Sequence, residues 1–183
     1  MSPAGTAGAA GTVTVVTPPP LLLVQDLGRA GYRAQGVPAG GAMDRWALQL
    51  ANALVGNEPG APALEWAGGG GMLRFSTDAT IALAGVDPEA VLGHEVVDAH
   101  RVLHAKAGEG LSIGRFRSGQ FLYVAVRGGL VVPPVLGSAA TYLPAGLGGV
   151  EGRSLRRGDV LPIGPATGPR PTRWIFSAAC SCV

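Results

Sequence analysis

The 183-residue sequence has few charged side chains, few aromatic residues and only two cysteines. Charged residues make up 14% of the chain and hydrophobic residues 47%, which excludes a chain that is disordered throughout. Cys180 and Cys182 stand at the extreme end with one residue between them, and this fits neither a zinc-site spacing nor an unstrained disulfide. The expected location is therefore the cytoplasm.

Signals for a membrane or for nucleic acid are also missing. No hydrophobic run approaches the ~18 residues that a membrane span needs. The Ala/Gly-rich residues 1–11 lack the positive charge that opens a signal peptide, and we expect them to be a disordered lead-in. The net charge is only +2 and no basic stripe is present, so we expect neither a nucleic-acid nor a membrane partner.

Several catalytic motifs are absent as well. Lys106 is the only lysine and is followed by Ala107, which excludes a P-loop. The run 146–153 fails the dinucleotide-binding spacing because Glu151 stands where the third glycine belongs. The serine-hydrolase motif G-x-S-x-G is missing, so Ser138 is only a minor candidate for a nucleophile.

The histidines give a weak metal signal. His100 and His104 would share one face of a helix and could bind zinc there, with His94 nearby. The residues between them read instead as a strand, in which positions four apart lie ~13 Å from each other. Surface histidines are the favoured interpretation, and we expect no metal site.

The sequence contains 30 glycines and 15 prolines, which separate short runs rich in Val, Leu and Ile. This pattern predicts a mainly β protein, a barrel or a sandwich. The predicted strands are residues 12–17, 21–24, 72–75, 80–84, 96–97, 101–104, 111–114, 120–126, 141–143, 159–163 and 174–176, and residues 131–136 read as an edge or a loop because of their two prolines.

One helix is predicted, at about residues 44–55. Asp44 suits its first position because a carboxylate accepts from the free amides of the first turn. Trp46, Leu50 and Leu54 repeat at helical spacing, which predicts that they form the packing face together with the alanines between them. Gly56 supplies the expected left-handed end.

The loop before this helix carries the main candidate site. Asp26, Arg29 and Tyr32 place a carboxylate, a guanidinium and a phenol on a glycine-bounded loop, and such groups can bind a small anion or amide and move a proton. The alternative is an Asp26–Arg29 pair that only pins the loop to the barrel. Residue chemistry leaves both interpretations open. Arg127 beside two glycines is a second candidate for binding an anion, although a loop-anchoring role is favoured.

The sequence also resembles a known family. The blocks VQDLGRAGY, GVPAGGAMD, LANALVGN, ALEW, VRGGL, LGSAAT, LGGVEGR and RRGDVL follow one another in this order. The series resembles the family of 5-oxoprolinase C subunits, also called biotin-dependent carboxyltransferase or allophanate hydrolase subunit 2, which includes a Kip-type antagonist. The resemblance implies a cyclophilin-like β-barrel, which we place at residues 12–168.

The resemblance implies three functions. The first is a component of a 5-oxoprolinase that works with A-type and B-type partner proteins and uses ATP to convert 5-oxo-L-proline to L-glutamate. The second is a carboxyltransferase component that acts on urea, with biotin carried by a partner. The third is a non-catalytic Kip-type protein that binds a B-type partner, which is allophanate hydrolase subunit 1-like. A small amide or urea is the implied substrate, and ATP is used by the assembled complex.

The matching motifs imply the site residues. The expected catalytic residues are Asp26, Arg29, Tyr32 and Arg127, and the expected substrate-binding residues are Gln25, Gly28, Gly41, Asp44, Gly128, Gly129 and Ser138.

This sequence departs from the family pattern in three places. Gly40 replaces a serine, and Ala139 and Ala140 replace an arginine and a serine. The family continues well beyond residue 183, and residues 169–183 do not resemble its continuation. We therefore expect an incomplete barrel with an atypical tail from a truncated or frameshifted gene, inactive as an isolated chain.

Overall fold

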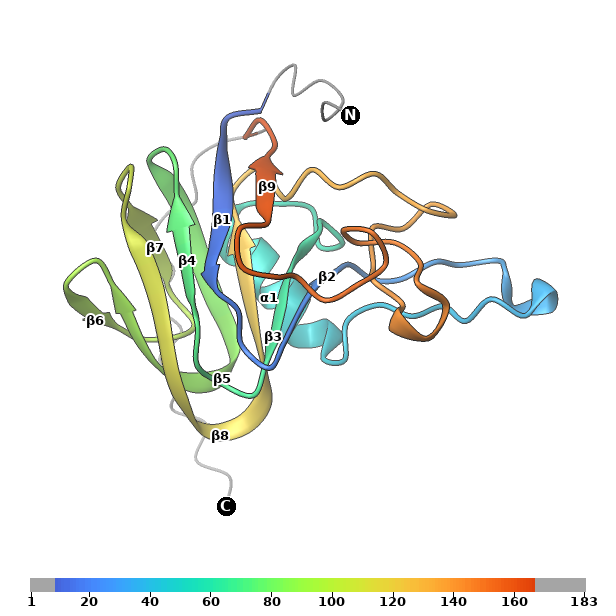
Figure 1. Cartoon of the computed structure of the whole chain (residues 1–183), viewed down its shortest axis with the longest axis horizontal. Helices are drawn as coiled ribbons and strands as arrows, with labels where there is room; N and C mark the ends of the chain where they lie inside the picture. Colours follow the sequence, from blue (N-terminus) through green and yellow to red (C-terminus); the bar gives the residue numbers. More distant parts are fainter. Residues whose placement is uncertain (1–8, 167–183) are drawn as a thin grey trace.

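The computed structural model describes residues 9–166, and in this range a curled sheet carries one α-helix on one of its faces (Figure 1). The tail 169–183, the strand predicted at 174–176 and most of the predicted lead-in lie outside the described residues. The strands are β1 (Gly11–Thr17), β2 (Leu21–Gln25), β3 (Ala63–Ala67), β4 (Met72–Phe75), β5 (Ala79–Leu92), β6 (Glu95–Val97), β7 (Val102–Ala105), β8 (Gly110–Val126) and β9 (Val160–Ile163). The mainly β prediction is confirmed, with a sheet curled into a half-barrel.

The long antiparallel pair of β5 and β8 joins the two halves of the sheet. The first part of β8 pairs with β4 and its last part pairs with β3, while β5 follows it on the other side. The prediction of separate strands at 111–114 and 120–126 is therefore wrong. Register shifts around Asp87 and Pro88 bend this strand pair, and residues 115–120 in the bend are largely exposed. This exposure hides the period-2 pattern that would have marked one strand.

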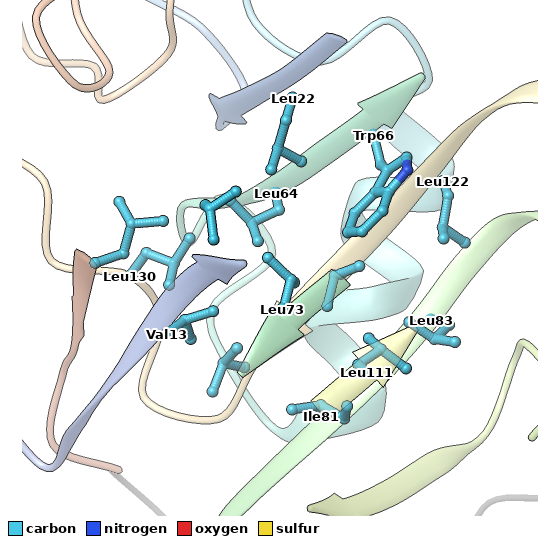
Figure 2. Packing of buried hydrophobic residues seen from close by; sticks show 14 of the residues in the cluster. Val13, Leu22, Leu64, Trp66, Leu73, Ile81, Leu83, Leu111, Leu122 and Leu130 are labelled. Carbon is cyan, nitrogen blue, oxygen red and sulfur yellow. The ribbon is translucent and has the colours of Figure 1, made fainter. Parts of the chain in front are cut away.

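The sheet is buried on both faces. Along β5, Ile81 and Leu83 belong to the larger apolar cluster, whereas Ala82 and Ala84 belong to a smaller cluster under the helix. Figure 2 shows the larger cluster, in which Trp66 of β3 lies among leucines from several strands. Alternation along β5 therefore separates a side with large side chains from a side with alanines.

The helix α1 (Arg45–Val55) begins and ends where the sequence predicts. The Asp44 carboxylate accepts from the backbone N–H of Ala47, and Gly56 ends the helix with φ +73°. The predicted packing face is wrong at two residues, because Trp46 is 83% exposed and Ala53 is exposed as well. The helix buries Leu48, Leu54 and Val55 against alanines of β5 and β8, and Trp46 lies outside this cluster.

Two long loops extend side by side away from the sheet (Figure 1). The first long loop, residues 26–44, contains the short 3-10 helix η1 (Arg33–Gln35). The second long loop, residues 131–159, contains η2 (Leu143–Ala145). The strand predicted at 141–143 is wrong, because Tyr142 makes only an isolated bridge to Leu147 before the chain turns. Residues 131–136 lie in this loop, as predicted.

Candidate functional site

The first long loop folds back on itself through glycine contacts. The N–H of Arg29 donates to the carbonyl of Ala39, at 2.8 Å, and the N–H of Ala42 donates to that of Asp26, at 2.9 Å. A Cβ atom on Gly28 would stand 2.6 Å from the Ala39 oxygen, and one on Gly41 would stand 2.8 Å from the Gly28 nitrogen. Both sequence-predicted glycines therefore serve close contact between two backbone segments of the same loop.

Asp26 joins the two long loops. Its side chain is 8% exposed, and one carboxylate oxygen accepts from the Gly28 N–H and the Ser138 hydroxyl, each at 2.7 Å. The other oxygen accepts from the Ala139 N–H, also at 2.7 Å. Three donors thus hold the carboxylate in one orientation, which makes Asp26 a positioning group.

Arg29 binds the second long loop separately. Its NH2 group donates to the Ala140 carbonyl at 2.5 Å, and no carboxylate of the described residues forms an ion pair with it. The predicted alternative of an Asp26–Arg29 pair is therefore wrong, although both side chains do anchor a loop. The Nε and NH1 atoms of Arg29 are buried and have no hydrogen-bond partner.

Gln25 and Ser138 complete the contacts between β2, the first long loop and the second. The Gln25 amide nitrogen donates to the Thr141 carbonyl at 3.1 Å, while its Oε1 atom is buried without a partner. Ser138 is 1% exposed, and its hydroxyl accepts from the Ala140 N–H besides donating to Asp26. A nucleophilic Ser138 has no support from this geometry, because its hydroxyl is buried and bonded to a carboxylate rather than to a histidine.

Tyr32 and Asp44 stand apart from Asp26. Tyr32 precedes η1, and its carbonyl accepts from the backbone of Gln35 and Val37. Within residues 9–166 its hydroxyl makes no hydrogen bond to the other site candidates. Asp44 uses its carboxylate to cap α1. The structure therefore places the predicted phenol and this second carboxylate on the same loop as Arg29 without joining them to it.

Arg127 lies at the opposite end of α1 from Asp44. Its NH1 group donates to the carbonyl of Val55 at 3.0 Å, in the last turn of the helix. An 11-residue helix is about 16 Å long, so this end is far from the first long loop. Gly128 donates to the Asn57 side chain, and Gly129 closes a turn onto Val126. The four predicted catalytic residues therefore do not form one cluster.

Sequence reasoning missed a buried acidic group beneath the start of α1. Glu65 of β3 is 3% exposed, and its Oε2 atom accepts from the Tyr123 hydroxyl at 2.7 Å and the Met43 N–H at 2.8 Å. Burial raises the pKa of Glu65, and burial also raises the pKa of Tyr123. The Tyr123 hydroxyl in turn accepts from the Asp44 N–H at 2.7 Å. A glutamate inside the apolar run ALEWA was the available signal.

Neither a metal cluster nor a membrane helix is found in the part of the chain that the structure describes. Within residues 9–166 no three His, Cys, Asp or Glu side chains come together to hold a metal. No helix in the same range is long and apolar enough to cross a membrane. His104 is exposed on β7, with its Nδ1 atom 3.4 Å from the Thr80 hydroxyl, so the strand interpretation of this histidine is confirmed.

Comparison with known proteins places the chain in a family. The family model "Carboxyltransferase domain, subdomain A and B" matches residues 35–181. The chain belongs to this carboxyltransferase domain family. The resemblance found in the sequence blocks is thereby confirmed.

The relatives of this carboxyltransferase domain include 5-oxoprolinase subunits and urea amidolyases. The chain is 48% identical over 141 residues to the C subunit of the Escherichia coli 5-oxoprolinase, covering 77% of this chain and 46% of that protein. It is 38% identical over 148 residues to the urea amidolyase of Lachancea kluyveri, covering 80% of this chain and 8% of that protein. The crystal structure of the K. lactis urea amidolyase superposes with a TM-score of 0.83 at 34% identity, covering 92% of this chain and 11% of that one.

The chain spans about half the length of the 5-oxoprolinase relatives, 46% of the C subunit in Escherichia coli and 45% of its counterpart in Haemophilus influenzae. Both relatives are named as subunits, a name that denotes one part of a larger enzyme. The matched region therefore corresponds to one portion of each relative.

Proposed function

We propose that the chain is a component of an ATP-dependent 5-oxoprolinase, similar to its C subunit, which works with A-type and B-type subunits to convert 5-oxo-L-proline to L-glutamate. The observation that carries the proposal is the 48% identity to the Escherichia coli C subunit over most of this chain. In the reaction the lactam C–N bond breaks, water supplies the new carboxylate oxygen, and the ring nitrogen becomes an amine.

The geometry supports a binding role for the first long loop. Asp26 and Ser138 fix the two long loops against each other, and this linkage holds Arg29 in place. The donors of Arg29 suit an amide carbonyl or a carboxylate oxygen, the two acceptors of 5-oxo-L-proline. ATP belongs to the assembled complex in this proposal, because the sequence of this chain contains no P-loop.

Reconstitution tests the proposal. The chain would be mixed with A-type and B-type subunits from the same organism, and ATP hydrolysis and glutamate formation would be measured with and without 5-oxo-L-proline. We expect both activities to require 5-oxo-L-proline and this chain. An ATP hydrolysis rate that ignores 5-oxo-L-proline when every subunit is present would contradict the proposal.

A second candidate is a carboxyltransferase component that acts on urea. The similarity to the two urea amidolyases favours it, because the chain matches one of them at a TM-score of 0.83. In this case carboxybiotin on a partner would donate its carboxyl group to a urea nitrogen. Formation of carboxylated urea with a biotinylated partner, and no glutamate from 5-oxo-L-proline, would select this function. Tight binding to a B-type subunit with neither reaction would select a Kip-type binding role.

A further inference from the structure

The guanidinium of Arg29 is buried without a counter-charge from the side chains of residues 9–166. The residue is 2% exposed, and a guanidinium stays positively charged at physiological pH. The 12 acidic residues of the sequence all lie within the described range 9–166. None of these side chains comes within ion-pair distance of Arg29. An unpaired buried charge is strongly destabilising, so a negative group from outside this set of side chains is required.

The hydrogen-bonding capacity of Arg29 is also only partly used. The NH2 group binds the Ala140 carbonyl, whereas the Nε and NH1 atoms have no acceptor. Among the buried side-chain nitrogen and oxygen atoms of the described residues, Gln25 Oε1 is the only other atom without a hydrogen-bond partner. Since buried polar groups in folded proteins are nearly always paired, the unused donors of Arg29 indicate a missing acceptor.

Two glycines lie close to the guanidinium. A Cβ atom on Gly40 would lie 3.1 Å from NH1, and one on Gly148 would lie 3.0 Å from NH2. Gly40 is exposed, whereas Gly148 is buried. Gly40 is therefore a solvent-exposed neighbour of NH1.

We propose that Arg29 binds a carboxylate that comes from outside the chain, at the NH1 edge and from the side of Gly40. NH1 and NH2 form a planar fork whose N–H groups donate to the two oxygens of a carboxylate. The proposal rests on the proposed function, because 5-oxo-L-proline carries a carboxylate and urea carries none. The carboxylate is either that of the free substrate or an Asp or Glu side chain of a partner subunit.

Thermal unfolding of the full chain tests the free-ligand source. We expect 5-oxo-L-proline and acetate to raise the Tm, by about 5–10 °C for a ligand present at ~100 times its Kd. Neutral 5-oxo-L-prolinamide and urea should leave the Tm unchanged. Arg29→Lys, which lacks the fork, should lose the effect, while Arg33→Lys should keep it because Arg33 is exposed on the same loop.

A second measurement keeps the test independent of any variant that fails to fold. The Nε–H signal of Arg29 in nitrogen-15 NMR of the wild-type chain should shift during titration with 5-oxo-L-proline. If free carboxylates leave this signal unchanged, a B-type subunit should shift it, and Arg29→Lys should weaken that complex at least tenfold. This outcome would assign the carboxylate to the partner.

Two outcomes would overturn the inference. One is an Arg29 signal that responds neither to free carboxylates nor to the B-type subunit. The other is a carboxylate-dependent rise in Tm that persists in Arg29→Lys while the Arg29 signal stays unchanged. Neither readout involves turnover, so a reconstituted complex without 5-oxoprolinase activity would refute the proposed function and leave this binding result standing.

Discussion

The sheet and the pair of long loops are held together by different kinds of contact. In the sheet, large apolar side chains from most of the strands fill one cluster, with Trp66 fully buried among them. Between the two long loops, Arg29 donates to the Ala140 carbonyl, and the Asp26 carboxylate accepts from the Ser138 hydroxyl and the Ala139 N–H. Dispersion and hydrophobic burial are non-directional, whereas these hydrogen bonds depend on individual atoms.

This difference separates the part of the molecule that provides stability from the part that carries the candidate site. The stability of a sheet core is the sum of many small dispersion contacts, so no single contact determines it. The loops position Arg29 through a few polar contacts, so one substitution can displace the site without unfolding the sheet. The following predictions test the separation.

The largest expected effect belongs to the sheet. Trp66→Ala removes the largest fully buried side chain and the hydrogen bond from its indole to the Gly70 carbonyl. We expect the free energy of unfolding to fall by about 3–5 kcal/mol, measured by urea denaturation. Hydrogen exchange should quicken throughout the sheet. A change confined to the loops would contradict the assignment of stability to this cluster.

Asp26→Asn should act mainly on the loops. An asparagine keeps an acceptor for Gly28 and Ser138 but turns an N–H₂ group toward the Ala139 N–H, which loses its partner. We expect a loss of about 2 kcal/mol in the free energy of unfolding and faster amide exchange at residues 138–141 than elsewhere. Asp98→Asn is the matched control, because Asp98 is exposed and pairs only with Arg101. Equal effects of the two variants would refute the prediction.

The two regions should also respond to pH in opposite directions. Burial raises the pKa of Glu65 in the sheet above its ordinary value of 4.5, so its contribution to stability is full below 4.5 and is lost as pH rises through the folded-state pKa. The hydrogen bond from Arg153 lowers the pKa of Asp159 in the second long loop below 3.8, so its contribution is present above 3.8 and is lost as pH falls.

Urea midpoints measured from pH 2 to 8 check both directions. Glu65→Gln should flatten the decline on the alkaline side of ~4.5, and Asp159→Asn should flatten the loss on the acidic side of ~3.8. If Glu65→Gln leaves the alkaline slope unchanged, ionisation of Glu65 is not the cause of the loss of stability as pH rises. Asp159 serves as the acidic-side comparison, because its two carboxylate oxygens lie 2.7 and 3.1 Å from the Arg153 guanidinium.

The smallest expected effect is at the surface of the helix. Trp46 is 83% exposed and makes no contribution to the apolar clusters, so Trp46→Ser should change the free energy of unfolding by less than about 0.5 kcal/mol. Leu48→Ala, in the same helix and fully buried, should cost about 2–5 kcal/mol in the same assay. A large effect at Trp46 would mean that the described helix face is covered.

Local signals predicted the elements that local chemistry controls. The ends of α1 follow from Asp44 and Gly56, and the strand at 72–75 follows from its apolar run after four glycines. The curvature was not predictable, because the bend in β8 depends on how β5 shifts register beside it. Trp46 was misjudged because helical spacing gives a face but not the width of the space beneath it.

The sequence predicted only part of the candidate site, because local signals do not show contacts between residues far apart in the chain. The sequence placed Asp26 and Arg29 together on a glycine-bounded loop, and both do anchor that loop. It could not give Ser138 as the partner of Asp26, because the two residues are 112 positions apart. The contact between Glu65 and Tyr123, 58 positions apart, was hidden by the same kind of separation. Such contacts arise only from strand order.

Because β8 is continuous, the part of the sheet around β4 and the part around β3 should unfold as one cooperative unit. Because the same 17-residue strand pairs with β4 near its start and β3 near its end, neither half can open without disturbing the other. Amides near Ile113 and near Val124 should therefore exchange through openings of the same free energy, as members of a single foldon. The first long loop, which hydrogen bonds join to the second, should open at a lower free energy.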